Sequence, residues 1–444
     1  MRWLVHTYFL FILCLGFLTA CVSVPEKEYA SLDEPFVKTV EVRKQGDRFQ
    51  LFRHGKPFFI KGGAGRTHLA ELSAAGGNSI RTWNTDNLLP LLDEADSLGI
   101  AVTVGLYVQP ERQGFDYDDM EARKKQQDSL IREVKRFKDH PAVLMWAIGN
   151  ELTLRGKNPK VWDAVNDIAA EIHEVDPNHP TTTMIMPSSA TTTAIAKQAP
   201  NIDIISLNVF GVLGKIPKRI RYFFWNWDGP YLISEWGPRG WWEAYDTDWL
   251  APVEGSTQVK AKFCHQRYQA CMGKDTTRCL GSYVFYWGQK QERTHTWFSM
   301  FLESGEKTGL VDQMQFEWTG TWPDNLCPQV RNIRLNGKQT FENIYLEPGK
   351  SYEAFVEVED KESDSLSYEW HIEPEGNYAG MTGGDKEVRP DSISGLLQSP
   401  LQPKIGMTAP EKTGPYRLFV TIRDGKGGAA TANAPFYVID NRLY

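Results

Sequence analysis

The sequence has little that would suit it to nucleic acid, metal or nucleotide binding. Its 49 Lys and Arg residues are outnumbered by 56 Asp and Glu residues, and the charges are interspersed, so there is no basic footprint for nucleic acid. It has no C-x-x-C spacing and no closely spaced histidine pair, which disfavours a zinc site. We therefore expect no nucleic-acid partner, no metal and no cofactor.

The first 21 residues are typical of a secretory segment rather than of a fold. Arg2 provides a charged start, residues 10–18 are apolar, and small residues precede Cys21. The tetrapeptide LTAC at 18–21 resembles the bacterial lipobox, which implies cleavage and lipidation at Cys21. We expect acyl chains there to anchor the protein to the membrane of the bacterial cell envelope, at the outer membrane, with residues 22–36 as a polar tether. The alternative is a signal anchor that remains as a transmembrane helix.

Four further cysteines fit an oxidising compartment, and their even number permits two disulfides. Cys264 and Cys271 are seven residues apart on a predicted helix, about 10 Å along its axis, too far to bridge each other. Two pairings remain. We favour Cys271–Cys279 with Cys264–Cys327, because the first closes a short loop after the helix.

Residues 37–327 alternate short apolar runs with amphipathic stretches at helical spacing. Eight such units predict a closed (β/α)8 TIM barrel, an α/β fold with a parallel sheet. A doubly wound sheet is the alternative, but GGAG at 62–65 lacks the G-x-G-x-x-G spacing. The predicted strands are residues 58–61, 79–83, 101–106, 143–148, 182–186, 202–209, 231–234 and 282–287.

Residues 328–444 change to the alternating pattern of antiparallel strands, broken by glycine-containing turns. We predict a C-terminal immunoglobulin-like β-sandwich with Trp370 in its core. The segment DKESDSLSYEWHI at 360–372 resembles the cadherin-like or polycystic-kidney-disease-type modules of bacterial surface enzymes. Its acidic residues could bind calcium, but a solvated loop is the favoured interpretation.

Polar residues occur where several predicted barrel strands end. In a TIM barrel the catalytic groups lie at the C-terminal ends of the strands. Two carboxylates on opposed strand ends suit hydrolysis of a glycosidic bond, which needs a proton donor at the leaving oxygen and a second carboxylate at the anomeric carbon. The strand-end residues are Arg81, Asn150, Glu151, Asn208, Glu235 and Trp287.

Two of these strand ends carry specific motifs. WAIGNEL at 146–152 and ISEWGPRG at 233–240 resemble the signatures of the retaining glycosidase clan that includes families 2 and 5. The likeness is greatest to bacterial lipoproteins with a family 2-like barrel and covers about residues 55–326. It implies that Glu151 is the general acid/base and Glu235 the nucleophile, with no metal. It also implies that Asn150 donates to the sugar 2-hydroxyl and that Arg81 holds Glu235 ionised.

The resemblance also implies that Trp287 would form the floor of the sugar subsite. From their positions in the predicted barrel, we expect Asn208, at a strand end, to help to bind the sugar and Trp236 and Trp297, in the loops that follow, to stack on it. Other loop tryptophans with the same potential are Trp225, Trp227, Trp241 and Trp242.

One position departs from the clan's pattern. A Tyr near the end of the sixth strand usually donates a hydrogen bond to the nucleophile, and Phe210 stands there. Tyr107, Tyr286 or Asn208 could replace that donor, or catalysis is weakened. Because no β-sandwich pattern precedes the barrel, we do not expect a β-galactosidase-like enzyme.

The sequence therefore predicts a retaining β-glycoside hydrolase or transglycosylase, acting as a monomer on a β-linked glucan or related polysaccharide. The carboxyl groups of Glu151 and Glu235 should be about 5 to 5.5 Å apart, the separation typical of retention. The alternative is an inactive carbohydrate-binding or scaffold lipoprotein on the same barrel.

Overall fold

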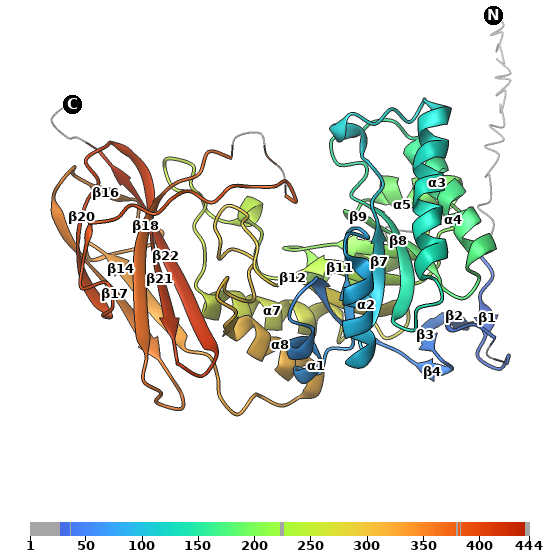
Figure 1. The fold of residues 1–444 in the computed structure, drawn as a ribbon, viewed down its shortest axis with the longest axis horizontal. Helices are drawn as coiled ribbons and strands as arrows, with labels where there is room; N and C mark the ends of the chain where they lie inside the picture. Colours follow the sequence, from blue (N-terminus) through green and yellow to red (C-terminus); the bar gives the residue numbers. More distant parts are fainter. Residues whose placement is uncertain (1–26, 36, 223–225, 379–380, 382, 440–444) are drawn as a thin grey trace, which may run out of the picture.

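The computed structural model describes residues 27–35, 37–222, 226–378, 381 and 383–439. The chain forms a barrel, drawn from blue to yellow in Figure 1, and a β-sandwich in orange and red beside it. This confirms the predicted fold class. The predicted secretory segment and Cys21 lie outside the described residues. Within the described residues, no helix is long and apolar enough to cross a membrane.

The barrel is closed and all of its strand pairs are parallel, with the last strand hydrogen-bonded to the first. Closure excludes the doubly wound alternative. Each strand is buried almost throughout, because helices cover the outside of the sheet and side chains fill its interior. Its strands are β5 (Ile60–Gly65), β6 (Ser79–Arg81), β7 (Ala101–Leu106), β8 (Val143–Asn150), β9 (Thr181–Ile185), β10 (Ile204–Asn208), β11 (Tyr231–Trp236) and β12 (Cys279–Trp287).

The helices around the barrel bury one apolar face each. In α3, the Asp119 side chain caps the helix by accepting from the backbone N–H groups of Glu121 and Ala122, while Leu130 and Val134 pack on the core. The α-helices are α1 (Leu69–Ala74), α2 (Leu88–Ser97), α3 (Met120–Phe137), α4 (Val161–Val175), α5 (Ser189–Gln198), α6 (Ile216–Tyr222), α7 (Thr257–Cys271) and α8 (Gly309–Thr319). Three short 3₁₀ helices are η1 (Glu111–Gln113), η2 (Leu213–Lys215) and η3 (Trp241–Glu243).

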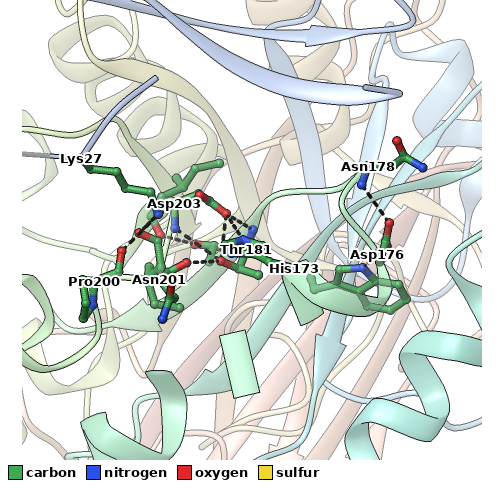
Figure 2. A network of polar contacts seen from close by, with 12 residues as sticks. Lys27, His173, Asp176, Asn178, Thr181, Pro200, Asn201 and Asp203 are labelled. Atoms are coloured by element: carbon green, nitrogen blue, oxygen red, sulfur yellow. Dashed lines mark hydrogen bonds and ion pairs between the residues drawn. The ribbon is translucent and has the colours of Figure 1, made fainter. Parts of the chain in front are cut away.

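A small sheet and the segment before it cover the base of the barrel, where the strands begin. The sheet contains β1 (Ala30–Ser31), β2 (Val40–Gln45), β3 (Arg48–Arg53) and β4 (Lys56–Pro57). Figure 2 shows Lys27 reaching Asp203, to which its ammonium is 2.8 Å away. Tyr29 donates to the Asp203 carbonyl at 2.8 Å. The predicted tether is therefore wrong for residues 27–31, because Lys27 and Tyr29 bond to the barrel and β1 pairs with β2.

The C-terminal domain consists of two packed sheets, with Trp370 buried in its core as predicted. The two-residue strand β13 (Lys307–Thr308), from the barrel side, pairs with β22 and extends one of these sheets. The remaining strands are β14 (Gln329–Leu335), β15 (Lys338–Gln339), β16 (Ile344–Leu346), β17 (Ser351–Glu359), β18 (Ser367–Pro374), β19 (Leu397–Gln398), β20 (Lys404–Thr408), β21 (Gly414–Arg423) and β22 (Gly428–Val438).

Buried polar contacts join the two domains. The Glu254 carboxylate accepts hydrogen bonds from Thr294 at 2.6 Å and from Asn433 of β22 at 2.7 Å, and it forms an ion pair with Lys260. Arg417 of β21 donates to the Pro252 carbonyl at 2.9 Å. Because unpaired buried charges are costly, these matched contacts favour one relative placement of the domains.

The predicted disulfides are wrong. Cys264, Cys271, Cys279 and Cys327 are all buried free thiols in this structure. Burial raises the pKa of Cys264 and of Cys279 to about 12, which disfavours their reactive thiolate forms. The spacing in the sequence excluded one pairing but could not show whether the remaining side chains face one another.

Candidate active site

A cleft of about 750 Å³ opens at the C-terminal ends of the barrel strands. Asn150, Glu151, Asn208 and Glu235 all line it, so four of the predicted site residues come together. They lie on or directly after β8, β10 and β11. Barrel closure produces this meeting, because the carboxyl ends of all eight strands surround one mouth.

Glu235 is held by two donors from the end of β6. The Arg81 guanidinium lies 2.6 Å from Oε1 of Glu235, and the Trp83 indole N–H donates to the same oxygen at 3.1 Å. The guanidinium also lies over the Trp83 ring, 4.6 Å from its centroid. Arg81 is almost completely buried. Charge-assisted hydrogen bonds of this kind are short and directional, so the two donors fix the orientation of the Glu235 carboxyl group.

Glu151 lies in a different environment. It follows β8 with a φ of 50°, a left-handed conformation that is uncommon outside glycine and often found at functional sites. Its carboxyl accepts a hydrogen bond from Asn208 at 2.9 Å. Burial, and then the charge of Glu235, raise the pKa of Glu151 to about 7. Glu151 can therefore hold a proton near neutral pH, as the sequence predicted.

Two asparagines orient this pair of carboxyl groups. Ser234 donates to the Asn208 Oδ1 atom at 2.7 Å, which turns the Asn208 amide nitrogen toward Glu151. The Asn150 Oδ1 atom accepts from Arg81 at 2.6 Å and from Asn208 at 3.2 Å. Since its oxygen is occupied, the amide nitrogen is the group that Asn150 can offer to a ligand.

Trp83, which sequence reasoning missed, donates the hydrogen bond to Glu235 for which the sequence offered Tyr107, Tyr286 or Asn208. Phe210 packs against aromatic rings, with its centroid 5.2 Å from that of Trp242. Tyr107 donates to Gln113 instead, and the Tyr286 ring stacks on Trp83 at 5.8 Å between centroids. The sequence could have indicated Trp83 through its spacing from Arg81, because residues 81 and 83 of an extended strand point to the same side.

The predicted sugar contacts of three tryptophans are wrong, because all three side chains are buried away from the cleft. Trp287 donates to the His68 carbonyl at 3.0 Å and packs on Trp318. Trp236 packs on Tyr268, and the Trp297 indole N–H donates to the Arg239 carbonyl at 2.9 Å. Trp227 is also buried, and Trp225 lies outside the described residues. The tryptophans that line the cleft are Trp83, Trp241 and Trp242.

One group of possible metal ligands occurs among the described residues, away from the cleft. Ligand atoms of His295, His371 and Glu373 lie within 4.8 Å of one another. The Arg389 guanidinium donates to Glu373 at 2.7 Å and lies 3.1 Å from the His371 ring nitrogen. Because a guanidinium already supplies the positive charge there, these residues do not fit a metal ion.

The closed parallel barrel, with Glu151 and Glu235 in one cleft at its mouth, defines the class as a TIM barrel. Residues 74–239 match the family described as "Glycosyl hydrolases family 2, TIM barrel domain". This part of the barrel is thus similar to the family 2 barrel domain, and the resemblance predicted from the two strand-end motifs is confirmed.

The chain is also similar to β-glucuronidases. The Homo sapiens enzyme is 25% identical over 234 residues, which is 45% of this chain and 33% of that protein. The Pongo abelii enzyme is 26% identical over 254 residues, covering 50% of this chain and 36% of the relative. The chain therefore spans about a third of the length of these curated relatives.

Solved β-glucuronidase structures share the fold at low identity. Bacteroides uniformis β-glucuronidase 2, covalently bound to cyclophellitol-6-carboxylate aziridine, gives a TM-score of 0.50 at 14% identity, over 90% of this chain and 48% of that chain. Ruminococcus gnavus β-glucuronidase gives 0.50 at 15% identity, over 64% of this chain and 53% of that chain.

Proposed function

We propose that this protein is a retaining β-glycoside hydrolase or transglycosylase acting on a β-linked glucan or related polysaccharide. One observation carries the proposal. A carboxyl whose pKa is raised to about 7, Glu151, lies in one cleft with a carboxylate paired to a buried guanidinium, Glu235. Two carboxyl groups with opposite environments can divide the acid and nucleophile roles.

In the first step, an oxygen of Glu235 attacks the anomeric carbon while Glu151 gives its proton to the leaving oxygen. The glycosidic C–O bond breaks and a glycosyl–enzyme ester forms. In the second step, Glu151 takes a proton from water or from a sugar hydroxyl, which attacks the same carbon and releases Glu235. The Asn150 amide would bind the sugar 2-hydroxyl. The separation of 5 to 5.5 Å between the carboxyl groups stays a prediction of this mechanism.

The charges around the cleft favour a neutral sugar over the uronic acids named for the relatives. Three cationic residues line it, Arg112, Arg155 and Lys290. Two of them form ion pairs: Lys290 with Glu292, and Arg112 with Asp385 at 2.8 Å. An anionic sugar would have to compete with these carboxylates for its counter-ion.

The inactive-scaffold alternative rested on Phe210, and the Trp83 donor weakens it by supplying Glu235 with a hydrogen bond from the loop after β6. The test is a panel of neutral β-glucans, aryl β-glucosides and aryl β-glucuronides, with Glu235→Gln as the inactive control. We expect cleavage of neutral substrates, with NMR showing the β-anomer as first product. If no substrate of the panel is cleaved, the result supports the inactive scaffold. An α-anomer as the first product would contradict retention.

We also propose that the protein is a monomer anchored to the outer membrane through lipidated Cys21. Cys21→Ser should move it from the membrane fraction to the soluble fraction without changing its activity. The measurement is immunoblotting after membrane flotation, with Cys264→Ser as the control. Retention of Cys21→Ser in membranes would contradict the lipid anchor and favour the signal-anchor alternative.

A further inference from the structure

A long connection in the C-terminal domain reaches the barrel. Residues 375–396 link β18 to β19, and Figure 1 shows this connection extending from the sandwich toward the barrel. Its described residues are called the crossover segment here. Long connections without secondary structure are uncommon in compact domains and are often functional.

The crossover segment is fixed to the loop that follows β12. Gln291 of that loop donates to the Tyr378 hydroxyl at 3.0 Å, and the Arg293 backbone N–H donates to the Glu387 carboxylate at 2.5 Å. The Arg293 guanidinium lies 3.7 Å from the Trp241 ring centroid and 5.1 Å from that of Tyr378. A cation between two aromatic faces, one from each domain, holds them together.

The same segment is fixed to a second loop of the barrel mouth. Asp385 pairs at 2.8 Å with Arg112, which lies in η1 after β7. The strands β12 and β7 are separated in the barrel by β5 and β6. The crossover segment therefore spans part of the rim of the mouth and is anchored at both sides.

Between these anchors the segment forms a wall of the cleft. Gly383 and Gly384 line the cleft beside Trp242, whose side chain is 48% exposed. A Cβ atom at Gly383 would lie 3.8 Å from the Trp242 ring, so the backbone and the indole are adjacent. An exposed aromatic ring next to backbone polar groups suits a sugar ring, which has an apolar face and a rim of hydroxyls.

We propose that Trp242 and the Gly383–Gly384 backbone form a second sugar subsite, which binds an uncharged hexose ring adjacent to the sugar that is cleaved. The C-terminal domain is then part of the substrate-binding site. An uncharged ring fits because Asp385 and Glu292 neutralise Arg112 and Lys290, two cations that line the same cleft. This inference rests on the proposed function, since it assigns a further part of the same substrate.

The test measures binding without turnover, in the full-length Glu235→Gln protein. Calorimetry compares a neutral β-glucan tetrasaccharide with methyl β-glucoside. Gly383→Phe should fill the subsite and weaken tetrasaccharide binding at least tenfold, with methyl β-glucoside binding unchanged. Trp242→Ala should act in the same direction. Thermal unfolding of each variant checks that it is folded.

Val388→Phe is the matched control, because Val388 lies in the same segment, is 80% exposed and does not line the cleft. It should leave binding of both ligands unchanged. The inference is overturned if the tetrasaccharide does not bind, if both variants bind it like the parent, or if both ligands lose affinity equally. Failure of the wild-type protein to cleave any glycoside would overturn the proposed function instead. The binding measurements would still show whether the second sugar subsite exists.

Discussion

At the scale of single residues, the site depends on giving two chemically identical side chains different surroundings. Glu235 faces a guanidinium and an indole N–H, whereas Glu151 faces an amide, in a buried position close to a negative charge. The difference arises from which strand supplies each neighbour. Both of the following predictions alter one residue of this arrangement.

The first prediction concerns Glu151 and pH. Its pKa rises from an ordinary 4.5 to about 7 because of burial and the Glu235 charge. We expect kcat/KM to fall as pH rises above about 7, since the proton donor is lost. Glu151→Gln should remove this fall in kcat/KM at high pH. It should not slow the first step for activated aryl glycosides, because their leaving group needs no proton. Equal losses on aryl glycosides and on natural glucan would contradict the acid role.

The same shift affects stability, and its sign follows from proton uptake. Between pH 4.5 and about 7 the folded protein keeps a proton that the unfolded chain has lost, so stability falls as pH rises through this window. The fall should be on the order of 1–3 kcal/mol. Denaturant unfolding at pH 4.5 and pH 8 measures it, and Glu151→Gln should lack this component.

The second prediction concerns Trp83. Trp83→Phe keeps the ring but removes the N–H that donates to Glu235, so turnover should fall about 10- to 100-fold with little change in KM. Trp297→Phe is the matched control, because its N–H donates to the Arg239 carbonyl and it does not line the cleft. Equal effects of the two substitutions on steady-state kinetics would count against a positioning role for Trp83.

At the scale of elements, the segment before β1 closes the base of the barrel, on the side opposite the cleft. Asp203, at the start of β10, accepts hydrogen bonds from the Thr181 backbone and hydroxyl and pairs with Lys27 and His173, as Figure 2 shows. Burial alone would raise the pKa of Asp203, but the hydrogen bond with His173 and the charge of Lys27 lower it below its usual value.

We therefore predict that Asp203→Asn destabilises the protein by about 2–4 kcal/mol at pH 7. Because the folded-state pKa is lowered, this contribution is present above the unfolded value and is lost as pH falls below it. Urea unfolding at pH 7 and pH 3 should show the difference from wild type shrinking at the lower pH. Asp139→Asn, at an exposed position, is the control, and a difference that does not depend on pH would contradict the assignment.

At the scale of the whole molecule, the buried Glu254 carboxylate of the barrel domain accepts a hydrogen bond from Asn433 of the sandwich. We expect this contact to couple the unfolding of the two domains. Calorimetry of the wild type should therefore show one unfolding transition. Asn433→Ala should cost about 1–3 kcal/mol and separate two transitions, since it leaves a buried carboxylate with fewer donors. Lys404→Ala, at an exposed position of the same domain, should leave a single transition. Two transitions in the wild type would contradict the coupling.

Much of the fold and part of the site could be predicted from local patterns. Apolar runs alternating with amphipathic helices determine a parallel barrel, because both faces of each strand must be covered. Strand ends in a closed barrel meet at one mouth, so Arg81, Asn150, Glu151, Asn208 and Glu235 could be grouped before any contact was known. The grouping of these residues depends on closure of the barrel, which the periodic pattern already implied.

What the sequence by itself determined is therefore the barrel, the sandwich and the chemical types of residue at the mouth. The tertiary structure decided which strand-end side chains face inward, and so placed Trp83 on Glu235 and buried Trp287 against Trp318. It also decided that the cysteines stay apart as thiols and that Asp385 of one domain pairs with Arg112 of the other. The reason is physical: periodicity specifies which residues share a face, but the direction of a side chain and the pairing of distant segments depend on packing of the whole chain.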